Sequence, residues 1–417
     1  MLETGSRVQA LAVITLVLTA SAARADQWQF NPRVELGGET DSNYLLVPTS
    51  SATSVSGGFG NVLLELRDIG QTTEFRFAPG VYATYFPNES DYHSTNPYGY
   101  LELTHRGQVS TARLWAEYAD QSTVFSERLT SNVGAGGLGN PTGGDSGFLA
   151  LFNRRKTIHV NPSFAFEVSP LNHIAADLNY YNSAYDHFIP NTYTGYHVVA
   201  GSVGWVHDLT QRTSWTVRAL YSHNQPEAPS ITTNSAGLEG EWSERVSDTS
   251  RAYARVGGRR TQFDQIPAGQ SDRATSYYGG AGMDWSFQVT QLFLDVTRTV
   301  EPISSGYTVE RDQLVGRVTR NLSPVLLGYV GARAFKDKAL ESQTPYNDRT
   351  YAVGTVGFEW RFLRAWTVVG QYNYTRQKYV DFPEAATSNA ATLSVVYEPH
   401  RDLSRERLTP LGRDRGY

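Results

Sequence analysis

The segment 365-AWTVVGQYNYT-375 alternates between two kinds of side chain. One set consists of Trp366, Val368, Gly370, Tyr372 and Tyr374, and the residues between them are mostly hydroxyl or amide side chains. Successive side chains of a β-strand point to opposite faces of the sheet. The segment therefore predicts a strand with one apolar, aromatic face and one polar face.

The same period of two recurs in other segments, for example 74-EFRFAPGVYATYF-86, 173-HIAADLNYY-181 and 214-SWTVRALYSHN-224. Strands of a soluble β-sandwich can alternate in the same way, so the lengths of the connections between strands are needed to distinguish the two folds. Short connections such as "RDIGQ", "DLTQR" and "FLRA" take turns with long polar ones such as "PNESDYHSTN", "DHFIPNTYTG" and "KDKALESQTPYND". Tight turns at one end and long loops at the other are typical of an outer-membrane barrel.

Eight short turns and nine long loops can be distinguished along the chain. They predict an all-β fold, a transmembrane up-and-down antiparallel β-barrel of about 18 strands that covers residues 26–400. Sixteen strands is the alternative, because alternation is poor in "WQFNPRVELGG", "GYHVVAGSVGWVH" and "AYARVGGRRTQF". Pro79 and Pro162 stand inside predicted strands and indicate bulges there.

Pairs of aromatic residues eight positions apart lie on one face of two predicted strands. Trp366 and Tyr374 form one pair, and Tyr277 and Trp285 form the other. Aromatic side chains collect at both interfaces of a membrane barrel. The repeated spacing therefore predicts two aromatic girdles.

The N-terminal segment has the pattern of an export signal. Arg7 precedes an apolar run of about 13 residues, and Ala23-Arg24-Ala25 follows in A-x-A form. A membrane anchor, the alternative, needs about 20 apolar residues. We expect a signal peptide over residues 1–25, cleaved after Ala25, export to the outer membrane of a Gram-negative bacterium, and a polar C-terminal tail over residues 401–417.

Composition excludes several classes of protein. The chain has no cysteine, so disulfides, thiolate metal sites and a cysteine nucleophile are ruled out. A formal net charge of −5 does not suit nucleic-acid binding. With 25 Tyr, 18 Phe and 37 Gly, the chain is rich in strand aromatics. The partners we expect are outer-membrane lipid, lipopolysaccharide and the barrel assembly machinery.

One glycine-rich segment imitates a nucleotide-binding motif. Gly134, Gly136 and Gly139 in 131-SNVGAGGLGNPTGGDSG-147 have the G-x-G-x-x-G spacing. A dinucleotide site needs a buried strand before the first glycine and a helix after the last. Polar residues precede the motif, and Pro141 with further glycines follows it. We predict a loop and no cofactor.

Catalytic chemistry has little support in the sequence. Histidines at the i, i+4 spacing of a helical metal site and a G-x-S-x-G elbow are both missing. Asp91 with His93, and Asp186 with His187, lie in predicted external loops and resemble the Asp and His of omptin barrel proteases. An omptin-like hydrolase is therefore kept as an alternative, while the prediction is no enzyme, no catalytic residue and no metal.

Charged residues occupy the faces opposite the apolar stripes. In a barrel these faces line a lumen, which at about 18 strands is wide enough for water. Both signs of charge occur, which suits either a solvated wall or an arginine-lined path for anionic or sugar substrates. The lumen-lining candidates are Glu74, Arg76, Arg113, Glu117, Asp177, Arg218, Arg255, Arg259, Asp295, Arg317 and Glu359.

The third long loop, about residues 126–153, is the longest, and it carries the apolar segment 147-GFLALF-152. An exposed loop gains little from an apolar segment, and a loop of this length is often functional. We therefore predict a constriction folded into the lumen, although an exposed loop over lipopolysaccharide or neighbouring protomers is an equal alternative. The constriction candidates are Phe148, Leu149, Leu151 and Phe152, with Arg154, Arg155 and Lys156 at the base.

The opening 31-NPRVELGGETDSNY-44, followed by alternating strands to the end, resembles the outer-membrane β-barrel porins associated with exopolysaccharide gene clusters. The resemblance implies a channel or secretion accessory with a saccharide substrate or export machinery as partner. The predicted function is a porin-like channel for small polar solutes or saccharides, and an accessory role in exopolysaccharide export rests on the resemblance. A structural or adhesion barrel without transport is the main alternative.

Overall fold

The structure is a computed structural model. It describes residues 27–399 apart from 128–146, 148, 190–191, 229–230, 265–272 and 341–347. The predicted signal peptide and C-terminal tail, and almost all of the glycine-rich segment, lie outside the described residues.

The described chain is built almost entirely from strands. In chain order they are β1 (Gln27–Asp41), β2 (Val55–Ile69), β3 (Thr73–Tyr85), β4 (Ser94–Arg106), β5 (Ser110–Ser122), β6 (Arg154–Ser169), β7 (Asn172–Tyr185), β8 (Tyr196–Asp208), β9 (Thr213–Pro226), β10 (Thr232–Ser247), β11 (Ser250–Asp264), β12 (Arg273–Ser286), β13 (Thr290–Pro302), β14 (Thr308–Ser323), β15 (Leu326–Ala339), β16 (Arg349–Leu363), β17 (Trp366–Tyr379) and β18 (Ala386–Tyr397).

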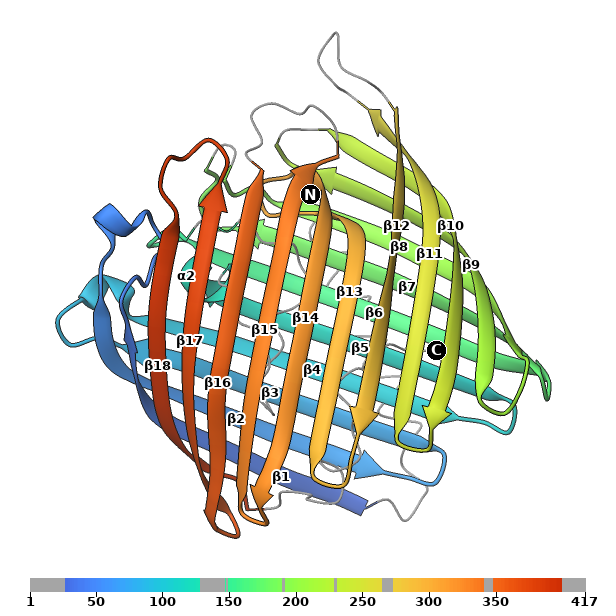
Figure 1. Ribbon diagram of the computed structural model, residues 1–417, viewed down its shortest axis with the longest axis horizontal. Coiled ribbons are helices and arrows are strands. Elements are labelled where there is room, and N and C mark those ends of the chain that lie inside the picture. The colour runs from blue at the N-terminus through green and yellow to red at the C-terminus, as the bar shows by residue number, and fades with distance from the viewer. Residues whose placement is uncertain are drawn as a thin grey trace, which may run out of the picture.

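Each strand pairs in antiparallel fashion with the next one along the chain, in an 18-stranded sheet. The last strand returns to the first, with Val34 opposite Tyr397 and Asp41 opposite Ala390, so that the sheet closes into a barrel (Figure 1). The prediction of an up-and-down barrel with 18 strands is confirmed. The alternative of 16 strands is wrong, because the weakly alternating segments form β1, β8 and β11. The hydrogen bonds between strands are made by the backbone, so a strand can form where the side chains alternate poorly.

The two faces of the barrel wall differ in polarity. Exposed large apolar side chains fall on one face, for example Leu178, Val256 and Val330, while their neighbours Asn179, Arg255 and Gly331 fall on the other. The four girdle aromatics predicted above are exposed on the apolar face. An apolar outer band with aromatic borders is what a lipid bilayer requires of a closed barrel. The protein is therefore a transmembrane barrel of the outer membrane, and its polar face lines the lumen.

The two prolines inside strands do not create bulges, which corrects that expectation. Around Pro79 the β2–β3 pairing runs from Leu63–Gly80 to Leu66–Phe77 in one register, with the positions between left unpaired. Around Pro162 the β6–β7 pairing breaks off and resumes in the same way. Proline removes one backbone donor toward one neighbouring strand, and the other neighbour still pairs, so the register survives.

The long connections carry the few helical turns, which are η1 (Thr49–Ser51), η2 (Ser90–Tyr92) and α2 (Thr123–Ser126). None of the helices in the described ranges is long and apolar enough to span a membrane. Buried apolar clusters lie where these long connections meet the barrel; one contains Tyr44, Phe86 and Val124. The packing of side chains inside the barrel is therefore concentrated at the end with the long loops.

Candidate functional site

The inner wall of the barrel holds all eleven residues predicted to line the lumen. Register places them on the inward face: Arg76 lies opposite Glu102, Arg218 opposite Glu239, and Glu359 opposite Leu327 and Val369. Asp177 is exposed on this face, as a side chain in contact with a water-filled lumen would be. The period of two was sufficient to assign these positions.

The wall formed by β1 to β5 carries arginines that are paired with glutamates. Arg113 lies 3.0 Å from Glu102, and Arg76 Nε donates to Glu65 at 2.5 Å. Arg67 contacts Glu74 across the β2–β3 pair. These three positive charges are thus each offset by a carboxylate beside them.

The wall formed by β9 to β14 is different. Arg218 lies 3.1 Å from Glu239 and 3.4 Å from Glu241. Within the described ranges, Arg255, Arg259 and Arg317 form no ion pair. Carboxylates interact with two of them only at longer range, Glu239 and Glu301 with Arg259 and Glu359 with Arg317.

Two of these arginines lie over tyrosine rings. The Arg259 guanidinium stands 5.0 Å from the centre of the Tyr278 ring, and its Nη1 donates to the Val300 carbonyl at 3.2 Å. Arg317 lies 5.8 Å from the centre of the Tyr329 ring, and its Nε donates to Thr319 at 2.9 Å. The rings hold the guanidinium planes in place by stacking while leaving some N–H donors unused.

Gly147 and the residues Leu149 to Leu151 lie inside the mouth of the barrel and contact the far wall. Gln377 Nε2, on β17, donates to the Gly147 carbonyl at 2.8 Å. Leu149 packs against a buried cluster that contains Phe335 and Tyr351, on β15 and β16. Since these residues lie just before β6, their contacts with β15 to β17 run across the mouth of the barrel.

Further contacts hold the same segment on the near side. Leu151 packs against the buried cluster of Tyr44, Phe86 and Val124. The Ala150 N–H donates to the Tyr193 hydroxyl at 3.0 Å, and the Ala150 carbonyl accepts from Thr123 at 2.6 Å. Burial raises the pKa of Tyr193, so its hydroxyl stays protonated at any physiological pH.

Two of the predicted constriction residues are placed differently from expectation. Phe152 is 71% exposed and has a φ of 63°, so it forms a turn at the base and anchors nothing. Arg154 faces outward, and its Nε donates to Asp120 at 2.8 Å. Arg154 is the first residue of β6, and the alternation of the strand places it on the face opposite Arg155. Phe148 lies outside the described residues, and Lys156 faces outward, 2.6 Å from Asp186.

Arg155 faces inward and is the centre of a buried polar network. Its Nη1 lies 3.1 Å from Glu127, which ends the turn α2. Glu127 also accepts hydrogen bonds from Tyr185 at 2.6 Å and from Ser304 at 2.8 Å. Ser304 belongs to the β13–β14 connection on the far side of the ring, so this network joins loops from opposite walls.

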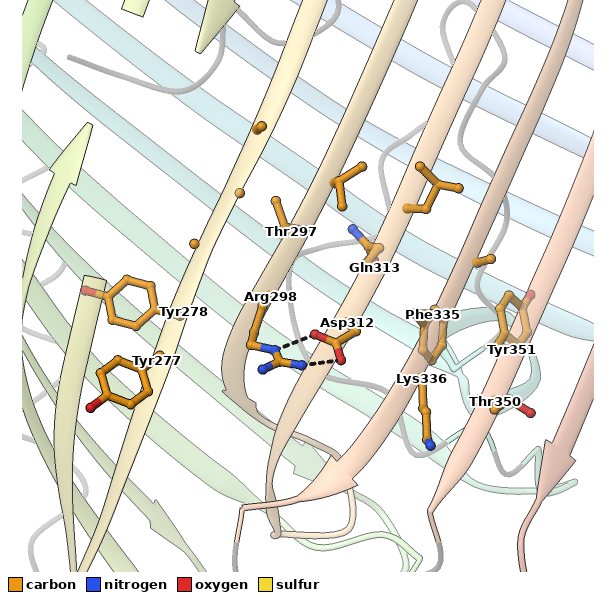
Figure 2. A pocket seen from close by; sticks show the side chains of 16 residues that line it. Tyr277, Tyr278, Thr297, Arg298, Asp312, Gln313, Phe335, Lys336, Thr350 and Tyr351 are labelled. Atoms are coloured by element: carbon orange, nitrogen blue, oxygen red, sulfur yellow. Dashed lines mark hydrogen bonds and ion pairs between the residues drawn. The ribbon is translucent and has the colours of Figure 1, made fainter. Parts of the chain in front are cut away.

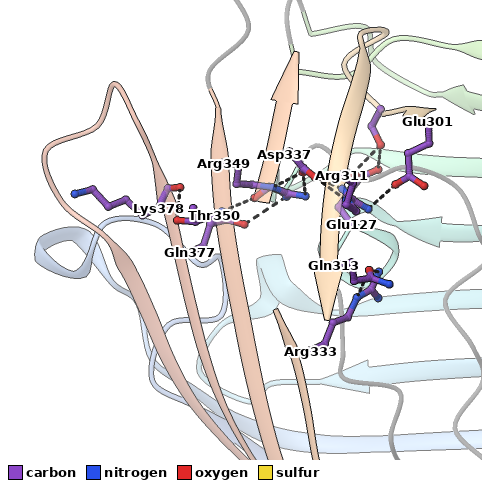
Figure 3. Close-up of polar contacts among 12 residues, drawn as sticks. Glu127, Glu301, Arg311, Gln313, Arg333, Asp337, Arg349, Thr350, Gln377 and Lys378 are labelled. Atoms are coloured by element: carbon purple, nitrogen blue, oxygen red, sulfur yellow. Dashed lines mark hydrogen bonds and ion pairs between the residues drawn. The ribbon is translucent and has the colours of Figure 1, made fainter. Parts of the chain in front are cut away.

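A second buried network lies where Gly147 meets the far wall (Figure 3). Asp337 accepts two hydrogen bonds from Arg311, at 2.6 and 2.9 Å, and one from Arg349 Nη2 at 3.0 Å. Both guanidiniums lie over the Phe335 ring, 4.2 and 4.8 Å from its centre. Asp337 was not predicted as a lumen residue because "KDKAL" has the composition of a loop, whereas β15 continues to Ala339.

The four Asp and His positions considered for hydrolysis lie in two different connections. Asp91 and His93 follow β3, and the His93 ring stacks on Tyr85, 4.6 Å between centres. Asp186 and His187 follow β7, where the ion pair to Lys156 engages Asp186. In the described part of the chain, His, Asp and Glu residues do not gather into a metal-binding group of three or more.

Comparison with known proteins adds only fold-level likenesses. No family model and no curated protein sequence matches the chain. Among solved structures it is similar to OpdQ of Pseudomonas aeruginosa, with 9% identity over 89% of this chain and 97% of that chain and a TM-score of 0.45. It is also similar to OccK2 (OpdF) of Pseudomonas aeruginosa in complex with glucuronate, with 9% identity over 89% and 98% and a TM-score of 0.44. The outer membrane channel DcaP of Acinetobacter baumannii has 10% identity over 89% and 97% and a TM-score of 0.43. At these identities the likeness concerns the fold alone.

Proposed function

We propose that the protein is a passive, porin-like channel through which small polar solutes cross the outer membrane. A barrel of about 16 to 18 strands encloses an aqueous lumen, and the inward face here is polar along its length. The observation that carries the proposal is the segment Gly147 to Leu151, which is bound to both walls of the mouth. A folded-in loop that narrows a polar lumen selects solutes by size and charge.

The unpaired arginines indicate which solutes the channel favours. Guanidinium groups bind carboxylates through two parallel hydrogen bonds, and Arg255, Arg259 and Arg317 have donors to spare. We therefore propose a preference for small anions, sugar acids included. An accessory role in exopolysaccharide export stays a prediction.

The proposal is tested by conductance measurements on the purified protein in planar lipid bilayers. We expect stable single-channel conductance and a permeability ratio that favours anions. Changing Arg255, Arg259 and Arg317 to Gln should lower the anion-to-cation ratio several-fold, because a local positive potential concentrates anions. Changing the outward-facing Arg260 and Arg273 to Gln should leave the ratio unchanged.

Two results would contradict this proposal, the first its channel function and the second its anion preference. A barrel that migrates in folded form on a gel but gives no conductance would favour the structural or adhesion alternative. A ratio that does not respond to the three lumenal substitutions would contradict the anion preference while leaving the channel itself intact.

A further inference from the structure

A row of polar side chains runs across the outer face of five strands, where the wall should be apolar. Arg298, Asp312, Lys336, Thr350 and Lys378 are consecutive register neighbours from β13 to β17. The next row toward the long loops adds Glu310 opposite Lys338. Along their strands, these positions alternate with buried residues that face inward, such as Arg311, Asp337 and Gln377. They therefore face the membrane.

The position of this row identifies what it faces. On the periplasmic side of the row, the outer wall is apolar, for example at Val296, Leu314 and Val330. Tyr277 of the outer aromatic girdle lines the same groove as the row. The row therefore lies at the outer border of the hydrocarbon band, at the height of lipid headgroups.

The row carries an excess of positive charge. Arg298 and Asp312 neutralise each other through two hydrogen bonds, at 2.5 and 2.7 Å. In the described part of the chain, Lys336, Lys338 and Lys378 form no ion pair. The other carboxylates in the two rows are Glu310 and Asp348, so with Arg298 and Asp312 four cations face three carboxylates. On the opposite side of the barrel, by contrast, Lys156 is paired with Asp186. Three lysines without an ion pair thus lie close together on β15 and β17.

A groove of about 870 Å³ accompanies the row on this face (Figure 2). Tyr277, Arg298, Asp312, Lys336 and Thr350 are among the residues that line it. One end opens where β12 parts from β13: the pairing stops at Gly279–Arg298, although β12 starts at Arg273.

We propose that this cationic rim, defined as Lys336, Lys338 and Lys378, binds the phosphorylated sugar headgroup of an outer-leaflet glycolipid such as lipopolysaccharide. Lysine ammonium groups at headgroup height attract phosphates, and the groove gives the sugar or a chain a place to lie. The inference depends on the placement in the membrane and not on transport through the lumen.

The test measures binding of diphosphoryl lipid A to the purified full-length barrel in detergent, with dephosphorylated lipid A as the paired ligand. We expect tighter binding of the diphosphoryl form, weakening at high salt because the attraction is electrostatic. Changing Lys336, Lys338 and Lys378 to Gln should weaken it by about 10- to 100-fold. Replacing Arg154, Lys156 and Arg260 by Gln removes three outward cations away from the rim and should change it little.

Several outcomes would overturn the proposal. Equal affinity for the two lipids would show that the apolar belt binds acyl chains without reading phosphate. Displacement of lipid A by inorganic phosphate at matched ionic strength would indicate a site for a free anion. An unchanged affinity in the triple lysine variant would exclude the rim. The two-lipid and salt comparisons use the unaltered protein, so they decide the question even if the variant fails to fold, and channel conductance reports separately on the proposed function.

Discussion

At the scale of single residues, the buried pair of Arg155 and Glu127 is the contact whose loss should cost most. Glu127 is enclosed and accepts hydrogen bonds from both walls of the mouth. Changing Glu127 to Ala leaves Arg155 buried without its carboxylate, which typically costs about 3 to 5 kcal/mol. We expect a drop of that size in the free energy of unfolding, measured by urea titration of the detergent-solubilised barrel.

An exposed pair provides the control for this prediction. Asp120 contacts the half-exposed Arg154 on the outer face, so Asp120→Ala should cost less than about 1 kcal/mol. Changing both Glu127 and Arg155 to Leu should recover most of the loss, since no charge is then left alone. If Glu127→Ala and Asp120→Ala lowered the free energy of unfolding by the same amount, the buried network would not be coupled as described.

The backbone conformation and close contacts of Gly147 lead to a prediction about single-channel conductance. Its φ is 74°, and an added Cβ would lie 1.8 Å from Arg349 Nη1 and 2.6 Å from the Tyr379 hydroxyl. Gly147→Ala should therefore free the segment from the far wall at a cost of about 1 to 2 kcal/mol for the backbone alone. We expect single-channel conductance to rise. Gly354→Ala, which meets nothing within 4 Å, should have no effect on conductance.

At the scale of elements, the segment before β6 depends on two leucines that anchor it to opposite clusters. Burying a large apolar side chain completely stabilises a fold by about 1.5 to 3 kcal/mol. Leu149→Ser or Leu151→Ser should cost less than this, because both leucines are partly exposed. We expect conductance to rise in both variants while the barrel stays folded on gels.

Phe152 supplies the matched control for the leucines. It is a larger apolar side chain from the same segment, but it is 71% exposed, so Phe152→Ser should leave conductance unchanged. If Phe152→Ser widened the channel as much as Leu149→Ser, the anchoring described here would be wrong.

At the scale of the whole molecule, one side of the wall meets lipid and the other meets water. Leu178 lies outward near the middle of β7, and Asn179 beside it lies inward. An arginine on the lipid face near the bilayer midplane costs about 2 to 4 kcal/mol. We expect Leu178→Arg to lower the free energy of unfolding in lipid bilayers by that amount and Asn179→Arg by much less. Equal costs would contradict the assignment of the faces.

The barrel itself could be predicted from sequence because its signals are local. The alternation in 365–375 fixes which side chains share a face, and the lengths of turns such as "DLTQR" and loops such as "DHFIPNTYTG" fix how neighbouring strands connect. Strand count and the inward position of residues such as Arg76 and Arg259 follow from these signals. The strand ends were harder, since polar residues such as those in "KDKAL" occur equally in loops and at the rim of a barrel.

The sequence by itself thus determined the strands, their order and the polarity of the two faces, because hairpin pairing joins segments that are adjacent in the chain. Only the tertiary structure decided which inward charges are neutralised, that Phe152 and Arg154 point away from the lumen, and that Gly147 meets Gln377 on the far wall. These features depend on contacts between residues far apart in sequence, such as Glu127 and Ser304, which become neighbours only when the ring of strands has closed. A periodicity of two along one strand carries no information about what lies across the lumen.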